Sequence, residues 1–171
     1  MNFPISNTIF IAIIGFLLLY SYKFFSSKDP SIVEHLWGSI KGNLRKFYFI
    51  SIGICFIAYF FIFIYLFKTN KLNNDLIFKI TIAISGMILS SILWMPISII
   101  YYKNRSMLLK IMVIFILLLV SLFAFYLIKL LKDINENTIY HKLALYGSMY
   151  FFFQVFILDF IYWNYAFLYN S

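Results

Sequence analysis

Residues 80–102, ITIAISGMILSSILWMPISIIYY, run without one charged side chain. A helix needs about 20 mostly apolar residues to cross the roughly 30 Å of hydrocarbon in a bilayer. Lipid offers no partner for unpaired backbone groups, so such a run crosses it as a helix. This stretch therefore predicts a transmembrane helix.

Four other segments of the chain have the same character. They lie at about 8–25, 47–67, 111–128 and 143–169, and Asp159 is the one charged residue within the last of them. The run 111–128 is slightly short, and we expect Lys110 and Lys129 to reach the membrane surface with their ammonium groups. The sequence predicts an all-α integral membrane protein, a single polytopic domain with a bundle of five transmembrane helices.

The composition excludes other classes of protein. Of the 171 residues, 64% are hydrophobic, 23% aromatic and 12% charged, and the mean hydropathy is +0.92. Soluble domains are about 45–50% apolar and about 25% charged, and disordered chains are poor in aromatic residues. The bias toward Ile, Asn, Phe, Tyr and Lys is what an AT-rich genome would produce, and it indicates nothing about the chemistry of the protein.

Basic residues flank the apolar runs, as anchoring residues do, and form no patch of the kind that binds nucleic acid. With the amino terminus outside, eight of them fall in the inner loops: Lys23, Lys28, Lys41, Arg45, Lys46, Lys103, Arg105 and Lys110. Six fall in the outer loops: Lys68, Lys71, Lys79, Lys129, Lys132 and Lys142. The positive-inside rule therefore favours an outer amino terminus and a cytoplasmic carboxyl terminus. No basic residue precedes Lys23, so the first segment is interpreted as an uncleaved anchor.

The first loop is expected to hold a short interfacial amphipathic helix at about 30–42. Its apolar residues fall at helical spacing: Ile32, Val33, Leu36, Trp37 and Ile40. Asp29 is the expected N-cap before Pro30, and Glu34 and His35 lie on other faces. We expect the Trp37 side to enter the acyl boundary, with lysines toward anionic headgroups; the alternative is a plain connector. The fourth loop, 132–142, is expected to be an exposed turn.

Polar residues inside the last and third spans are the candidate ligand or proton contacts: Asp159, Trp94, Trp163 and Gln154. Intramembrane carboxylates are costly and mark functional sites, although Asp159 is also one helical turn from Trp163, in an expected interfacial aromatic belt. Gln154 is expected to hydrogen-bond another helix. Pro96 should kink its helix beside Trp94 and open a small cavity, or it is an ordinary membrane-helix proline. One face is expected to turn toward the bundle interior: Ser148, Phe152, Val155, Asp159, Tyr162 and Ala166.

No catalytic or cofactor motif occurs in the chain. There is no glycine-rich phosphate loop, HExxH, CxxC or GxSxG. His35 and His141 fall in loops on opposite sides of the membrane, so no shared metal site is expected, and Cys55 is an embedded small hydrophobe. We expect no catalytic residues, no metal and no cofactor.

Three functions follow as hypotheses. The first is a non-enzymatic membrane-organising or interaction protein, whose partners are membrane lipids, itself or other membrane proteins. The second is a small carrier, or a protein that binds lipid or hydrophobic ligands, with a cavity near Asp159 and Trp94. The third is a lipid-modifying enzyme that uses Glu34, His35 and Asp159.

Overall fold

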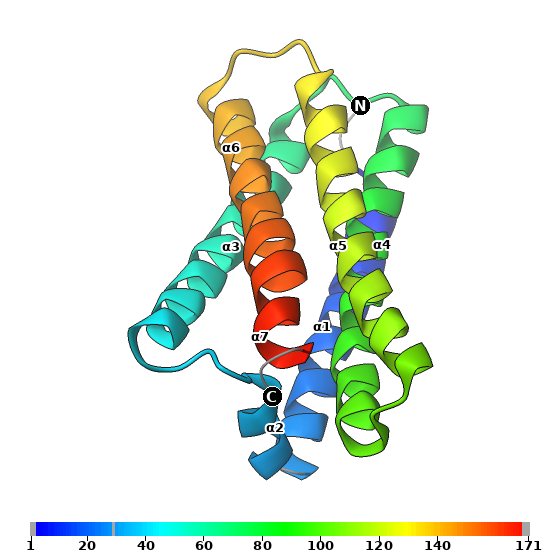
Figure 1. Cartoon of the computed structure of the whole chain (residues 1–171). Helices are drawn as coiled ribbons and strands as arrows, with labels where there is room; N and C mark the ends of the chain where they lie inside the picture. The colour runs from blue at the N-terminus through cyan, green and yellow to red at the C-terminus, as the bar shows by residue number, and fades with distance from the viewer. Residues whose placement is uncertain (1–2, 29, 169–171) are drawn as a thin grey trace.

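The computed structural model describes residues 3–28 and 30–168, and the ordered elements within these ranges are helices (Figure 1). They are α1 (Ile5–Lys28), α2 (Pro30–Leu36), α3 (Gly42–Lys68), α4 (Asn74–Asn104), α5 (Met107–Lys132), α6 (Ile139–Phe153), the π-helix η1 (Gln154–Trp163) and α7 (Asn164–Leu168). The last three follow one another without a break, as one long helix, Ile139–Leu168.

Five helices are long and apolar enough to cross a membrane, which confirms the predicted number. They are α1, α3, α4, α5 and the continuous helix Ile139–Leu168. Each begins before the segment that predicted it, because polar residues at the ends continue the helical backbone. The predicted final residue, Tyr169, lies outside the described residues, as does Asp29.

Local signals set several helix ends. The Asn73 side chain accepts a hydrogen bond from the backbone of Leu76 at 2.8 Å and caps the start of α4. The Thr138 hydroxyl does the same for His141 at 3.2 Å at the start of α6. Helix α4 ends where Arg105 adopts a left-handed conformation, with φ of 50°.

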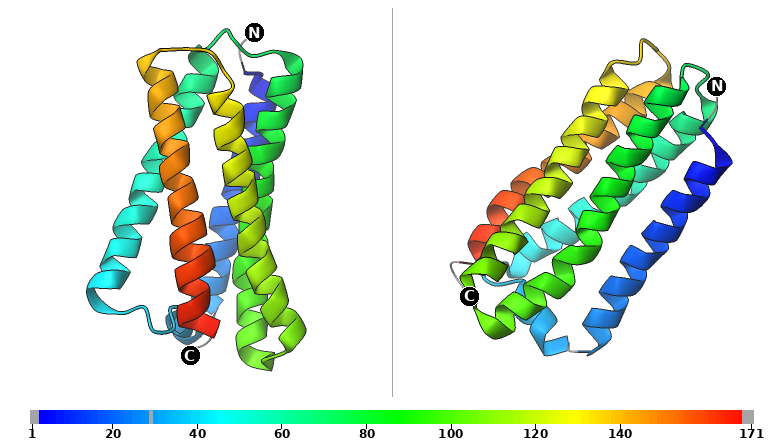
Figure 2. Two further views of the ribbon diagram at one scale, coloured as in Figure 1. Left: turned by 45° about the horizontal axis from the view of Figure 1, so that its top comes forward. Right: turned by 90° about the vertical axis from the view of Figure 1, so that its right-hand side faces the viewer.

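The helices form a bundle in which α4 pairs with α5, and α3 pairs with α6. Helix α1 packs mainly against α4 and lies at the outside of the bundle, as the right-hand view of Figure 2 shows. The two ends of the described chain lie at opposite ends of the bundle (Figure 1), as an odd number of crossings requires.

Small residues allow the paired helices to approach closely. A Cβ atom at Gly86 would lie 2.5 Å from the ring of Phe123, across the contact between α4 and α5. A Cβ atom at Gly147 would lie 3.0 Å from that of Ala58, across the contact between α3 and α6. The buried residues form two clusters, one in each half of the bundle.

The first loop differs from the predicted helix at 30–42. Helix α2 ends at Leu36, because the chain turns at Gly38, whose φ of +52° is left-handed. Its apolar side chains pack on the end of the bundle instead of facing lipid: Ile32, Leu36 and Ile40 are buried. The first loop therefore closes this end of the bundle.

Trp37 also lies against protein. Its ring contacts those of Tyr48 and Phe49, with centroids 5.9 and 5.3 Å away. The guanidinium of Arg45 lies over it at 4.8 Å. This aromatic cluster fixes the path from the first loop into α3.

Most of the fourth loop is exposed, as predicted, but Glu136 also ties it to α3. Glu136 accepts hydrogen bonds from Thr69 at 2.7 Å, Tyr65 at 3.0 Å and Thr138 at 3.3 Å. Burial acts to raise the pKa of Glu136, but these three hydroxyl donors outweigh it and hold the pKa below its usual value of 4.5. The carboxylate ties the α5–α6 loop to the end of α3.

We expect Glu136→Gln to remove part of the acid sensitivity of the protein. A carboxylate whose pKa is depressed in the folded state stabilises it above its unfolded pKa, and this contribution is lost as the pH falls through the folded pKa. Between about pH 6 and about pH 3.5, the midpoint temperature of thermal unfolding should therefore fall further for the wild type than for the variant. The control is Asp133→Asn, an exposed carboxylate in the same loop. Identical pH profiles for wild type and Glu136→Gln would contradict this role.

Candidate functional site

Asp159 lies in η1, half-buried, in the half of the bundle that the first loop closes. Its described hydrogen bond comes from Gln154, whose Nε2 donates to Asp159 Oδ1 at 3.0 Å. The ion pairs in the described part of the chain join Arg45 to Glu34 and Lys79 to Asp75. Among these residues, then, an uncharged amide is the side-chain partner of the carboxylate.

The π-helix explains why Gln154 pairs within its own helix. An α-helix turns every 3.6 residues, so residues five apart lie on different faces. A π-helix hydrogen-bonds residues five apart, and its wider turn brings them closer to the same face. The prediction that Gln154 bonds to another helix is therefore wrong, because it assumed α-helical geometry.

The same wider turn divides the predicted inward face. Ser148, Val155 and Ala166 are buried, as expected. Tyr162 is 41% exposed, and Asp159 is half-buried. The face predicted from α-helical periodicity is interior at its two ends and turns partly outward near Asp159.

Three residues of α1 and α3 interact electrostatically with Asp159 and were missed by sequence reasoning. Tyr22 of α1 and both Tyr48 and Cys55 of α3 lie within its electrostatic range. The Tyr22 hydroxyl donates to the backbone oxygen of Ser91 at 3.2 Å, and the Tyr48 hydroxyl donates to that of Leu158. Both tyrosine hydroxyls therefore join their helices to neighbours and are not bonded to the carboxylate of Asp159.

Trp94 and Trp163 pack against each other but differ in their hydrogen bonds. Their rings meet edge to face, with centroids 4.9 Å apart. The ring of Tyr22, from α1, also contacts Trp94, with centroids 5.9 Å apart. Trp163 Nε1 donates to the backbone oxygen of Leu36 at 2.8 Å and so holds the first loop. Trp94 Nε1 is buried without a partner.

Gln154 also has a buried polar atom without a partner. Five side chains in the described part of the chain have one: Ser85, Trp94, Ser98, Gln154 and Asn164. The Gln154 side chain is 3% exposed, and its Oε1 accepts no hydrogen bond, while its Nε2 bonds Asp159. A buried unsatisfied acceptor costs about 1–3 kcal/mol. Such a group indicates a place for a donor that the polypeptide itself does not supply.

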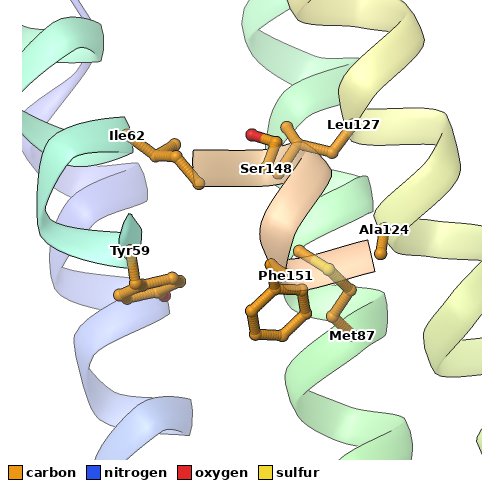
Figure 3. Close-up of a pocket in the computed structure, with 7 residues that line it drawn as sticks. All are labelled: Tyr59, Ile62, Met87, Ala124, Leu127, Ser148 and Phe151. Atoms are coloured by element: carbon orange, nitrogen blue, oxygen red, sulfur yellow. The ribbon is translucent and has the colours of Figure 1, made fainter. Parts of the chain in front are cut away.

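The cavity shown in Figure 3 lies elsewhere, between α3, α4, α5 and α6. Its volume is about 10 Å³, and it is lined by Tyr59, Ile62, Met87, Ala124, Leu127, Ser148 and Phe151. The Ser148 hydroxyl already donates to the backbone of Ala144 at 2.7 Å. This volume holds about one water molecule at most, so it is a packing defect. It includes none of Trp94, Pro96 and Asp159.

Glu34 and His35 have separate partners. Both oxygens of Glu34 meet Arg45, at 2.6 and 3.0 Å, and the hydrogen bonds from Arg45 lower the pKa of Glu34. The His35 ring stacks on Tyr102, with centroids 5.0 Å apart. These contacts fix the first loop and engage neither residue with Asp159.

The remaining metal-ligand side chains do not converge. Within residues 3–28 and 30–168, no three His, Cys, Asp or Glu side chains lie together as a metal site would require. His141 bonds the backbone oxygen of Leu131 through Nε2 at 2.8 Å. Cys55 is buried with a free thiol.

Of the four residues proposed from the sequence as ligand or proton contacts, the structure joins Asp159 to Gln154 by a hydrogen bond and Trp94 to Trp163 by a ring contact. Both tryptophans pack in the same cluster as Leu158 and Phe160, the neighbours of Asp159 in the chain. The structure adds Tyr22 and Tyr48 to the surroundings of Asp159. Comparisons of the chain with family models, with curated proteins and with solved structures found nothing that matches it.

Proposed function

We propose that this chain is a non-enzymatic membrane protein that acts by association within the bilayer. The observation that carries the proposal is its exposed apolar surface. Over its most hydropathic window, α1 is only 11% buried, against 28–44% for the other four long helices. Phe10, Phe16 and Tyr20 are among its exposed large side chains. Side chains of the types that act in catalysis, such as Glu34 and His141, instead hold loops in place.

Two glycines, one at a partly exposed position on α1 and one at an exposed position on α3, support association with other helices. A Cβ atom at Gly15 of α1 or at Gly53 of α3 would meet nothing within 4 Å, so the described fold does not require glycine there. Glycine costs roughly 0.5–1 kcal/mol relative to alanine within a helix. Small residues let membrane helices approach one another closely. We infer that another helix, of a second copy or of another membrane protein, packs there.

Self-association in liposomes tests this proposal. We expect the wild type to show energy transfer between labelled copies that rises with the ratio of protein to lipid. Gly15→Leu or Gly53→Leu should weaken association by about tenfold without changing the thermal unfolding midpoint, since both sites are open. The control is Phe125→Leu on an exposed position of α5. Wild-type copies that stay monomeric at every density would contradict self-association.

We further propose that the amino terminus is outside and the carboxyl terminus cytoplasmic. The first-loop end of the bundle carries eight Lys and Arg residues, and the opposite end carries six. Basic residues near the ends of spans are retained on the cytoplasmic side. The first loop, with Lys41, Arg45 and Lys46, then faces the cytoplasm.

Binding of a hydrophobic ligand near Asp159 and Trp94 is a second candidate function. The specific observation that favours it is the group of unsatisfied polar atoms. Gln154 Oε1 and Trp94 Nε1 are both buried without partners, and Gln154 bonds a carboxylate that no described ion pair neutralises. A polar group in hydrocarbon without a partner is costly, so a ligand with matching groups would bind there.

We expect Asp159→Asn to weaken such binding by about tenfold, because hydrogen bonds to charged groups are worth about 1.5–3 kcal/mol. Folding should persist, since asparagine keeps an oxygen that accepts from Gln154 Nε2. Quenching of tryptophan fluorescence by amphiphiles brominated on a dodecyl chain measures the binding. The matched control is Asp133→Asn, which removes an exposed carboxylate from the opposite end. Equal quenching in wild type and Asp159→Asn would count against this second function.

A further inference from the structure

Asp159 and Gln154 have the chemistry of a site for an organic cation, and aromatic side chains pack in the same cluster as Leu158 and Phe160, the chain neighbours of Asp159. Asp159 Oδ1 accepts from Gln154 Nε2 at 3.0 Å, and the second carboxylate oxygen, Oδ2, has no described hydrogen bond. Gln154 Oε1 is a buried acceptor without a partner. Two acceptors on neighbouring side chains suit a ligand that is rich in N–H donors.

Charge balance points to the same class of ligand. Removing a carboxylate from water costs several kcal/mol unless an opposite charge or a proton compensates it. The described surroundings of Asp159 contain an amide, two tyrosines and a thiol, and no basic side chain among them. A cation from outside the polypeptide would supply the missing charge.

The aromatic rings add a second feature of cation recognition. The ring centroids of Tyr22 and Trp94 lie 5.9 Å apart, and the Trp163 ring packs against that of Trp94. Aromatic faces attract organic ammonium groups through their electron-rich centres. These rings come from α1, α4 and η1, so the site lies where three elements meet.

Access to the site comes from the bilayer. Asp159 is half-buried, and helix α1 packs against α4 and contacts α2, with no extensive packing on α3. Tyr22 of α1 and Tyr48 of α3 both interact electrostatically with Asp159. A ligand with an alkyl chain can therefore present its headgroup to Asp159 while the chain stays in lipid.

We propose that this site binds an amphiphile with a primary ammonium headgroup and a single alkyl chain. The ammonium donates to Asp159 Oδ2 and Gln154 Oε1, and the alkyl chain extends between α1 and α3. The inference rests on the second candidate function, ligand binding near Asp159, and names the headgroup that this site takes. It is independent of self-association through Gly15 and Gly53.

The test compares two probes that differ only in the headgroup. The wild-type chain in phosphatidylcholine nanodiscs is titrated with dodecylamine and with dodecanol, each brominated on the chain, and tryptophan quenching is corrected for empty nanodiscs. We expect dodecylamine to bind about tenfold or more tightly than dodecanol. Asp159→Asn should remove this difference, while Asp133→Asn should keep it.

The outcomes separate the inference from the function on which it rests. Equal affinity for dodecylamine and dodecanol in the wild type overturns the proposed preference for an ammonium headgroup. The site would then bind neutral ligands, as expected if Asp159 carries a proton. Absence of saturable quenching with either probe overturns both the inference and ligand binding. The headgroup comparison needs only the wild type, so it decides the question even if Asp159→Asn does not fold.

Discussion

Alanine in place of Gly38 is expected to lower the free energy of unfolding by about 2–4 kcal/mol. The φ of +52° at this residue is left-handed, which strains any residue with a Cβ atom. The added Cβ would also overlap the backbone oxygen of Ala166 and lie 2.9 Å from its carbonyl carbon and 3.0 Å from Phe167 Cα. Backbone atoms cannot rotate away, so the first loop must move off α7.

Gly42→Ala is the matched control for this effect. Gly42 has a similar φ of +60°, but a Cβ atom there would meet nothing within 4 Å. The control should cost only the conformational strain, about 1–2 kcal/mol. Thermal unfolding in detergent compares the two variants. Equal losses would show that contact between the first loop and α7 contributes nothing to stability.

Trp163→Ala is expected to cost about 3–5 kcal/mol, the range for removing a buried large aromatic side chain. Trp163 is 4% exposed and packs between Trp94 and Phe167, with ring centroids 4.9 and 4.6 Å away. Its Nε1 donates to the backbone oxygen of Leu36 at 2.8 Å. The variant would lose both the packing of the helix end and its attachment to α2.

Trp163→Phe separates these two contributions. It keeps an aromatic ring and leaves the Leu36 oxygen without its donor, a loss of about 1–3 kcal/mol. Its unfolding midpoint should therefore lie between those of the wild type and Trp163→Ala. A midpoint for Trp163→Ala equal to that of the wild type would contradict the structural role of Trp163.

The five long helices could be predicted because placing a charged side chain in hydrocarbon costs free energy. Each spanning segment must therefore be largely free of charge by itself. The uncharged runs at 47–67 and 80–102 lie inside α3 and α4, whatever the rest of the chain does. Helix ends were predicted short, because polar residues such as Asn74 and Lys132 belong to helices that continue past the hydrocarbon. The number of helices thus depends on local composition, and their bounds depend on capping.

The first loop could be predicted only in part, because its partners are distant in sequence. The spacing of Ile32, Leu36 and Ile40 correctly indicated an apolar face. That face packs against the end of the bundle, and no local pattern distinguishes such a surface from lipid. The positive φ of Gly38 ends the helix early, and the close approach of Ala166 explains why glycine is required there.

The candidate site shows a further limit of periodicity. Asp159 and Gln154 were identified because polar side chains in an apolar run are rare, which is a composition signal. Their mutual hydrogen bond depends on the π-helix, and an assumption of 3.6 residues per turn assigns them to different faces. Tyr22 and Tyr48 resemble other tyrosines in the sequence, and only the packing of α1 and α3 brings them near Asp159.

Determining the side of the membrane on which each loop lies tests the five-helix membrane bundle most directly. Single cysteines are introduced in a Cys55→Ser background at Lys41, Lys71, Asn104 and Asn137, one at each connection between long helices, and labelled with an impermeant maleimide in sealed vesicles. Five crossings predict that the cysteines at 41 and 104 react from one side and those at 71 and 137 from the other. Labelling of 41 and 71 from the same side would contradict the five-helix membrane bundle.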